Sequence, residues 1–131
     1  MERKKVILIV DDDKLLARAF FRRIVGLKLD GGYTLIQDSD PKGAAEEAVS
    51  RDAQYFLLTD TEMPGMTGLE LIRELRLRLG DRLKCAVLMS GNPDYRARAS
   101  EAGANMFLAK PAGSDAEWQA FVSLLKDFIA S

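Results

Sequence analysis

Four short apolar runs in this sequence end on side chains that can do chemistry. The residues that follow them are Asp11-Asp12-Asp13, Asp60, Ser90-Gly91-Asn92 and Lys110. Taken singly, each has a structural explanation: an aspartate can cap a helix or hold a turn, a serine can be a loop hydroxyl, and a lysine can be a solvated charge. Taken together, they would put at least three carboxylates, a hydroxyl and an ammonium in one crevice, provided that the fold brings the ends of the runs to a common edge.

Three carboxylates in one crevice need a compensating positive charge. Two carboxylates about 5 Å apart repel each other by roughly 3 kcal/mol at an effective dielectric near 20, and a third adds further repelling pairs. A single lysine cannot balance them. Because carboxylate, carbonyl and water oxygens suit Mg²⁺ better than a softer metal, we expect a Mg²⁺ site.

A carboxylate held beside a metal ion at the tip of a strand is also a nucleophile for phosphoryl groups. The metal ion and an ammonium can share the phosphoryl oxygens while the carboxylate attacks in line. Asp60, which ends the apolar run 55–59, would then carry an acyl phosphate. The charge of that group could draw the Ser90 hydroxyl inward and transmit a switch to the surface.

The residue totals narrow the chemistry further. The chain has no histidine, which excludes Ser-His-Asp and Cys-His catalysis, histidine-ligated zinc and a phosphohistidine on this chain. Its 19 Lys and Arg against 20 Asp and Glu give a net charge of -1. Since there is no global basic field, we expect neither nucleic acid nor an anionic membrane as a direct partner.

Two features indicate the compartment. The apolar run 6–10 is too short for the core of a signal peptide or for a membrane span. Cys85 is the single cysteine and lies in an apolar run, so we expect a structural thiol without an intramolecular disulfide. Both features favour a cytoplasmic protein.

Apolar runs alternate with amphipathic segments along the whole chain, which predicts five β-α units. Most of the runs are apolar throughout, as in parallel strands that are covered on both faces. The predicted strands are 6–10, 33–37, 55–59, 85–89 and 106–109. The fold class is therefore α/β, a doubly wound parallel sheet whose ligand site lies at the carboxyl ends of the strands. At 131 residues we expect one domain, residues 1–131, with no output domain.

Residues typical of helix N-termini predict where four of the helices begin. Asp40-Pro41 and Asn92-Pro93-Asp94 each combine a capping residue with proline at the first helical position. The segments 67–70 and 114–117 fit the capping box, in which a hydroxyl and a carboxylate satisfy free backbone N–H groups reciprocally. The apolar stripe of the last predicted helix includes Trp118, which we therefore expect to lie away from the acidic residues.

At these residues the sequence resembles the receiver domain of bacterial two-component response regulators. The segments ILIVDDD, LLTDTEMPGMTGLEL, VLMSG and GANMFLAKP occur in the order and at the approximate spacing of that family, and the similarity covers essentially the whole chain. The resemblance implies a flavodoxin-like (βα)5 fold with strand order 2-1-3-4-5. It also implies a phosphoryl donor, either a histidine kinase or a histidine phosphotransfer protein, and a downstream protein target whose binding is switched. Such a domain catalyses only its own phosphorylation and dephosphorylation, so we do not expect an enzyme.

The resemblance also assigns roles to single residues. Asp60 would be the phosphoacceptor, and Asp12 directly and Asp11 through water would hold Mg²⁺, with the backbone carbonyl of Glu62. Lys110 would bind the phosphoryl group, and the bond from Lys110 to Pro111 would be cis. Two further positions correspond to the family's switch residues: Ser90, the hydroxyl, and Phe107, the aromatic ring that changes rotamer.

Several positions depart from the family's commonest residues. Ser90 replaces threonine and keeps the hydroxyl. Gly91 stands where alanine is usual, which would either loosen the loop after the fourth predicted strand or open a path to the phosphoryl group. Glu62 and Asn92 occupy positions that tune the hydrolysis of the acyl phosphate. Ala112-Gly113 replaces an apolar residue that often follows the Lys-Pro pair.

Four other functions compete with the phosphorylation-controlled switch. A phosphate sink or relay station would use the same chemistry, with flux as its output. A Mg²⁺-dependent phosphohydrolase of the haloacid dehalogenase type would use Asp11 and Asp13 as its D-x-D, but Leu15 stands where a small hydroxyl or valine is expected. A flavodoxin lacks support because no Ser/Thr-rich phosphate loop follows the first predicted strand. A degenerate receiver would more plausibly lack Asp60, Lys110 or the acidic pair.

Overall fold

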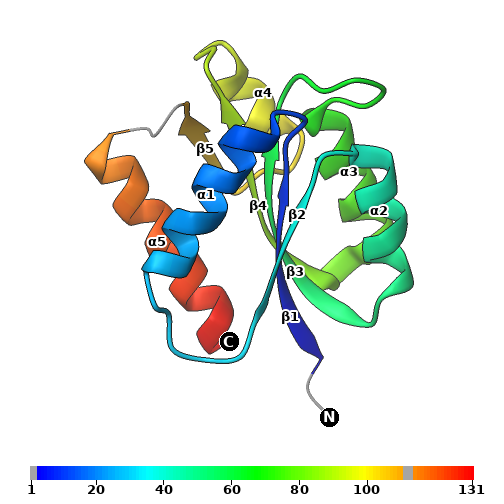
Figure 1. Ribbon diagram of the computed structural model, residues 1–131. Helices are drawn as coiled ribbons and strands as arrows, with labels where there is room; N and C mark the ends of the chain where they lie inside the picture. Colours follow the sequence, from blue (N-terminus) through cyan, green and yellow to red (C-terminus); the bar gives the residue numbers. More distant parts are fainter. Residues whose placement is uncertain (1–2, 111–113) are drawn as a thin grey trace.

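The computed structural model describes residues 3–110 and 114–131 and shows a five-stranded sheet between two layers of helices (Figure 1). The strands are β1 (Lys4–Val10), β2 (Thr34–Asp38), β3 (Ala53–Asp60), β4 (Leu83–Ser90) and β5 (Met106–Ala109). The helices are α1 (Lys14–Gly26), α2 (Pro41–Ser50), α3 (Gly68–Leu79), α4 (Tyr95–Glu101) and α5 (Asp115–Ala130), with a short 3₁₀ helix, η1 (Gly80–Arg82), before β4.

All neighbouring strands pair in parallel in the order β2-β1-β3-β4-β5, which confirms the predicted fold class and strand order. β1 is paired on both sides, with Ile9 opposite Gln37 of β2 and Leu58 of β3. The strand order reverses beside β1, between β1 and β3. A ligand site is expected at the carboxyl ends of the strands at this point.

Two apolar cores lie on opposite faces of the sheet because successive strand residues point to opposite sides. Ile7 and Ile9 of β1 pack under α1 and α5, against residues such as Phe20 and Phe121. Val6, Leu8 and Val10 pack on the other face with the buried residues of α2, α3 and α4. Burial of each Leu, Ile or Phe side chain stabilises the folded state by about 1.5–3 kcal/mol relative to leaving it exposed. This double coverage is why the central strands are apolar throughout.

The observed strands extend the predicted ones without changing their identity. Residues 106–109 agree with β5, whereas β1, β3 and β4 continue beyond the predicted runs into polar residues. The strand predicted at 33–37 runs one residue later, as Thr34–Asp38, and is only partly buried because β2 lies at the edge of the sheet.

Three of the four predicted helix starts are confirmed. Asp40 accepts a hydrogen bond from the Lys42 N–H with Pro41 at the first helical position, and both capping boxes are present, at 67–70 and at 114–117. The fourth start was predicted too early, since α4 begins at Tyr95. The Asn92 side chain accepts from the Asp94 N–H and closes a turn before the helix instead of capping it.

Two further expectations concern the residues after Lys110 and the possibility of a membrane span. The predicted cis bond to Pro111 and the segment Ala112-Gly113 lie outside the described residues. Within the described ranges, no helix is both long enough and apolar enough to cross a membrane.

Candidate functional site

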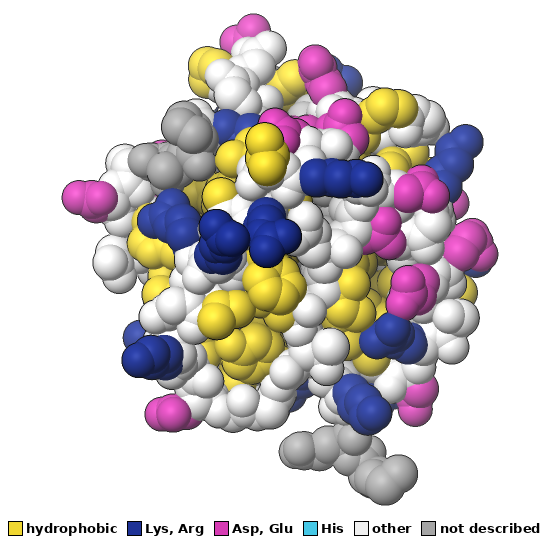
Figure 2. All heavy atoms as spheres, in the orientation of Figure 1, with side chains coloured by type: hydrophobic (Ala, Val, Ile, Leu, Met, Phe, Trp, Pro, Cys, Tyr) yellow, Lys and Arg dark blue, Asp and Glu magenta, His cyan; other side chains and the backbone are white. Residues whose placement is uncertain are grey.

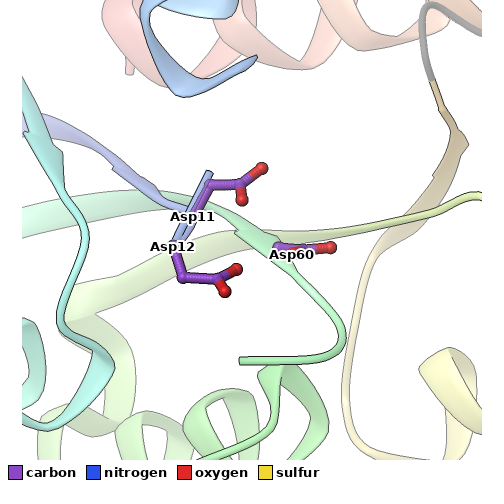
Figure 3. A group of neighbouring side chains, drawn as sticks. All are labelled: Asp11, Asp12 and Asp60. Atoms are coloured by element: carbon purple, nitrogen blue, oxygen red, sulfur yellow. The ribbon is translucent and has the colours of Figure 1, made fainter. Parts of the chain in front are cut away.

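Three carboxylates meet where β1 and β3 end. Asp11 and Asp12 directly follow β1, and Asp60 is the last residue of β3. Each offers one oxygen, and these oxygens lie within 4.8 Å of one another (Figure 3). The adjacent Asp13 does not join them, because its side chain caps α1 by accepting from the N–H groups of Leu15 and Leu16.

Lys110 joins two of the three carboxylates. Its Nζ lies 2.9 Å from Oδ1 of Asp60 and 3.1 Å from Oδ2 of Asp11. Burial by itself would lower the pKa of Lys110, but the hydrogen bonds and negative charges of Asp60 and Asp11 outweigh it and raise the pKa. The ammonium therefore stays charged and bridges Asp60 and Asp11.

Asp11 is fully buried, and this is the main reason that its pKa is raised. The N–H of Asp13 donates to Asp11 Oδ1 at 2.9 Å and opposes the shift, the charge of Asp60 adds to it, and Lys110 also opposes it. A buried carboxylate next to two others is costly with one ammonium as compensation. The donor set fits a small, hard divalent cation such as Mg²⁺, whose ligands are oxygens.

Asp60 is held by its own loop. The Thr61 N–H donates to Asp60 Oδ1 at 2.8 Å, and the buried Thr61 hydroxyl donates to the carbonyl of Met89 at 2.7 Å, which ties the loop to β4. The Asp60 side chain keeps 13% of its surface exposed. It is therefore oriented by the fold and still accessible from outside.

Gly68 is a site residue that the sequence reasoning missed. Its N–H donates to the carbonyl of Thr61 at 2.8 Å, and a Cβ at this position would lie 2.0 Å from the Asp60 carbonyl oxygen. Only glycine lets the start of α3 approach the end of β3 this closely. The signal was present in the sequence as Thr67-Gly68, a glycine directly inside a capping box.

Four of the remaining predicted residues, Glu62, Ser90, Gly91 and Asn92, line a pocket beside Asp60. The pocket has a volume of about 330 Å³ and is lined by Asp60, Thr61, Glu62, Ser90, Gly91, Asn92 and Lys110. Ser90 is buried, and its Oγ accepts from the Asn92 N–H at 3.0 Å. A Cβ on Gly91 would meet nothing within 4 Å, so this side of the pocket is open.

Phe107 is not among the residues that line the pocket. It lies on β5 with 6% of its surface exposed, in the core between the sheet and α4. The Arg96 guanidinium lies 4.7 Å from its ring centroid and pairs with Glu117 of α5 at 3.6 Å. The ring is thus covered by a cation that links α4 to α5.

The family of the chain is decided by its match to known proteins. Residues 7–121 match the response regulator receiver domain. The chain belongs to this family. Receiver domains obtain their phosphoryl group from histidine kinases, and their chemistry is confined to the phosphorylation and dephosphorylation of the domain itself. Receiver membership also sets aside the haloacid dehalogenase alternative.

Several individual receivers resemble this one. The chemotaxis protein CheY of Pseudomonas aeruginosa is 37% identical over 109 residues, which cover 80% of this chain and 83% of that protein. The two-component response regulator PhoP of the same species is 33% identical over 109 residues, which cover 80% of this chain but 44% of PhoP. The response regulator TrrA from Thermotoga maritima, solved in complex with Mg²⁺-BeF, has 25% identity and a TM-score of 0.74, covering 92% of this chain and 98% of TrrA.

Proposed function

We propose that this receiver accepts a phosphoryl group on Asp60 and changes its affinity for a protein target when it does so. The observation that carries the proposal is the shared ammonium: Lys110 contacts Asp60 and Asp11 at 2.9 and 3.1 Å. The same ammonium can turn to the oxygens of an incoming phosphoryl group without leaving the cluster. A phosphorylation site needs such a positive charge, preorganised beside its nucleophile.

The transfer itself uses one oxygen of Asp60. Lys110 and the Thr61 N–H both contact Oδ1, which leaves Oδ2 for attack on phosphorus. The Oδ2–P bond forms as the P–N bond of the donor's phosphohistidine breaks. The bonding electron pair stays on that nitrogen, and the imidazole leaves as a neutral ring because its other nitrogen already carries a proton. The product is an acyl phosphate on Asp60, which a water molecule later hydrolyses back to the carboxylate and inorganic phosphate.

Mg²⁺ would be held by Asp11, Asp12, Asp60 and the backbone carbonyl of Glu62. When bound, the ion neutralises carboxylate charge and stabilises the negative oxygens of the phosphoryl group in transfer. Support for this assignment comes from the three oxygens within 4.8 Å and from TrrA, a receiver solved with Mg²⁺-BeF. The residues of this chain supply the ligands and the nucleophile, and Lys110 supplies the second positive charge.

Ser90 and Phe107 would form the switch. The Ser90 Oγ accepts from Asn92, so its own hydrogen is available for a phosphoryl oxygen on Asp60. Movement of the loop after β4 toward the phosphoryl group would release space next to α4, where the Phe107 ring lies under Arg96. Gly91, Asn92 and Glu62 line the route to Asp60 and would set the lifetime of the acyl phosphate.

The proposal also includes the domain organisation, the cellular location and the partners of this protein. Residues 1–131 would act as a single receiver domain in the cytoplasm, with a histidine kinase or a histidine phosphotransfer protein as donor. Figure 2 shows basic side chains gathered near the middle of one face and acidic ones mainly above and to the right of them, and the net charge of the chain is -1. We do not include direct nucleic-acid binding in the proposed function, because the chain has no global basic field. A phosphate sink or relay would share the site and would differ by having no target whose affinity changes.

Trapping of the acyl phosphate tests the assignment of the acceptor residue. Protein incubated with a phosphorylated histidine phosphotransfer protein is treated with borohydride, which reduces an aspartyl phosphate to homoserine. Peptide mapping should find homoserine at position 60. Homoserine at position 11, 12 or 13 instead, with position 60 unmodified, would move the phosphoacceptor away from Asp60.

A further inference from the structure

A hydrogen bond joins α4 to Glu62, an exposed residue that lines the Asp60 pocket. The Tyr95 hydroxyl, on the first residue of α4, donates to Oε1 of Glu62 at 3.1 Å. Glu62 lies in the loop after β3, two residues beyond Asp60, and is one of the residues that line the pocket. The bond therefore connects the loop that holds the nucleophile to the helix that follows the Ser90 loop.

The contacts of Tyr95 restrict the position of its hydroxyl, which donates the hydrogen bond to Glu62. Its ring is half-buried and packs on the core between the sheet and the helices α2, α3 and α4. The Arg98 guanidinium lies 5.0 Å from the ring centroid, and the Tyr95 N–H donates to the carbonyl of Asn92 at 3.2 Å. The hydroxyl thus has a set position, whereas Glu62 is exposed and its long side chain is free to move without this bond.

Electrostatics would drive a free Glu62 carboxylate away from the pocket. Asp11, Asp12 and Asp60 carry three potential negative charges against the single ammonium of Lys110. Like charges that share one pocket repel each other even through partly exposed surroundings. A neutral donor such as the Tyr95 hydroxyl can hold a fourth carboxylate in place, because it adds a hydrogen bond without cancelling the charge.

We propose that Tyr95 is a positioning residue that holds the Glu62 carboxylate at the mouth of the Asp60 pocket. The inference rests on the proposed function of Asp60 and deepens it. The held carboxylate has two effects on the acyl phosphate cycle. It repels small anionic phosphodonors that enter by the pocket, and it accepts a hydrogen bond from a water molecule approaching the acyl phosphate, which favours hydrolysis.

The test compares four variants with the native chain. Tyr95→Phe removes only the donor, Glu62→Gln removes only the charge, and the double variant contains both changes. Tyr33→Phe is the matched control, since it also removes a tyrosine hydroxyl, at a residue that lines a separate pocket with Lys5 at the opposite end of the sheet. The measurements are the acetyl phosphate concentration for half-maximal labelling rate, the maximal rate, and the rate of hydrolysis after removal of the donor.

Tyr95→Phe should lower the half-saturating acetyl phosphate concentration by about threefold, with a smaller change in the maximal rate, as expected for a displaced charge. The effect should shrink at high salt because the interaction is exposed and screened. Hydrolysis should slow by about threefold. Glu62→Gln should act in the same direction, and Tyr95→Phe should have no further effect in the Glu62→Gln background.

Equal values for Tyr95→Phe and the native chain would overturn the proposal, as would an effect of Tyr95→Phe that persists in full without the Glu62 charge. The second result would mean that Tyr95 acts only through the packing of α4. A change in the maximal rate alone, independent of salt, would lead to the same conclusion.

The affinity for Mg²⁺ provides a measurement that does not need phosphorylation. A fourth carboxylate at the mouth attracts the cation, so Tyr95→Phe and Glu62→Gln should each raise the Mg²⁺ dissociation constant by about twofold at low salt, and Tyr33→Phe should not. If the native chain is not labelled at all, the proposed function fails and this measurement still decides the role of Tyr95. Unchanged dissociation constants in both variants would then overturn it.

Discussion

The ammonium of Lys110 lies 2.9 Å from Oδ1 of Asp60, although the two residues come from the ends of β5 and β3, with β4 between these strands. Replacing Lys110 by Met should reduce the maximal rate of labelling by acetyl phosphate about 100-fold, because the phosphoryl oxygens lose a preorganised positive charge. Binding of Mg²⁺ should persist, since the carboxylates remain. Intact mass and a Mg²⁺ titration separate the two effects.

Lys84→Met is the control for this experiment. Lys84 is exposed near the start of β4, far from the carboxyl ends of the strands, and the change removes the same charge. Labelling should match that of the native chain. An equal loss of labelling in both variants would mean that the total charge, rather than the position of Lys110, controls the reaction.

The close approach of Gly68 to β3 predicts a large effect on stability. Gly68→Ala would place a Cβ 2.0 Å from the Asp60 carbonyl oxygen, so the backbone must shift. The free energy of unfolding should fall by about 2–3 kcal/mol, as measured from denaturant curves. Gly91→Ala, at a position with nothing within 4 Å of the new Cβ, should change it by less than about 1 kcal/mol. Equal losses at both positions would contradict this account.

Cys85 predicts a dependence of stability on alkaline pH. Burial raises the pKa of this thiol to about 11, while the positive charge of Arg76 opposes the shift. The thiol of the unfolded chain ionises first, so the Cys85 contribution is intact below about pH 8 and is lost progressively as pH rises toward 11. By pH 10 the loss should be about 1–2 kcal/mol relative to Cys85→Ala.

The reactivity of Cys85 is a second test of its burial. A thiol reagent at neutral pH should label the native chain only through unfolding, and denaturant should speed the reaction strongly. Rapid labelling of the native chain, or an alkaline stability profile identical to that of Cys85→Ala, would show that the thiol is exposed.

Trp118 predicts a fluorescence signal from the packing of α1 on α5 rather than from the acidic site. The Arg23 guanidinium lies 3.5 Å from the Trp118 ring centroid, and the ring stacks on Phe121 at 5.2 Å. Arg23→Gln should therefore change the emission spectrum, whereas saturating Mg²⁺ should leave it unchanged. A spectrum that responds to Mg²⁺ and not to Arg23→Gln would contradict this.

The sequence predicted the parts of this molecule that depend on local chemistry. Continuous apolar runs predict strands that are covered on both faces. The capping boxes could also be predicted, because the hydroxyl and the acid of each lie three residues apart. The cluster of Asp11, Asp12, Asp60 and Lys110 could be predicted because parallel strands bring their carboxyl ends to one edge. The roles of these residues in phosphorylation remain predictions until they are measured.

Other features depend on contacts that no local pattern contains. The need for glycine at position 68 arises from an approach to the Asp60 carbonyl, and the bond between Tyr95 and Glu62 joins two loops that meet only in the fold. The start of α4 was placed early because Asn92-Pro93-Asp94 resembles a cap, whereas the Asn92 side chain closes a turn. β2 is only partly buried because it lies at the edge of the sheet, so its weak apolar pattern placed it one residue too early.

Intact mass after incubation with Mg²⁺ and acetyl phosphate tests the central claim most directly. The native chain should gain the mass of one phosphoryl group only when Mg²⁺ is present, and Asp60→Asn should gain none under the same conditions. Absence of a gain in the native chain, at times and concentrations that label a known receiver, would contradict the account. A gain that persists in Asp60→Asn would contradict the assignment of Asp60 as the acceptor.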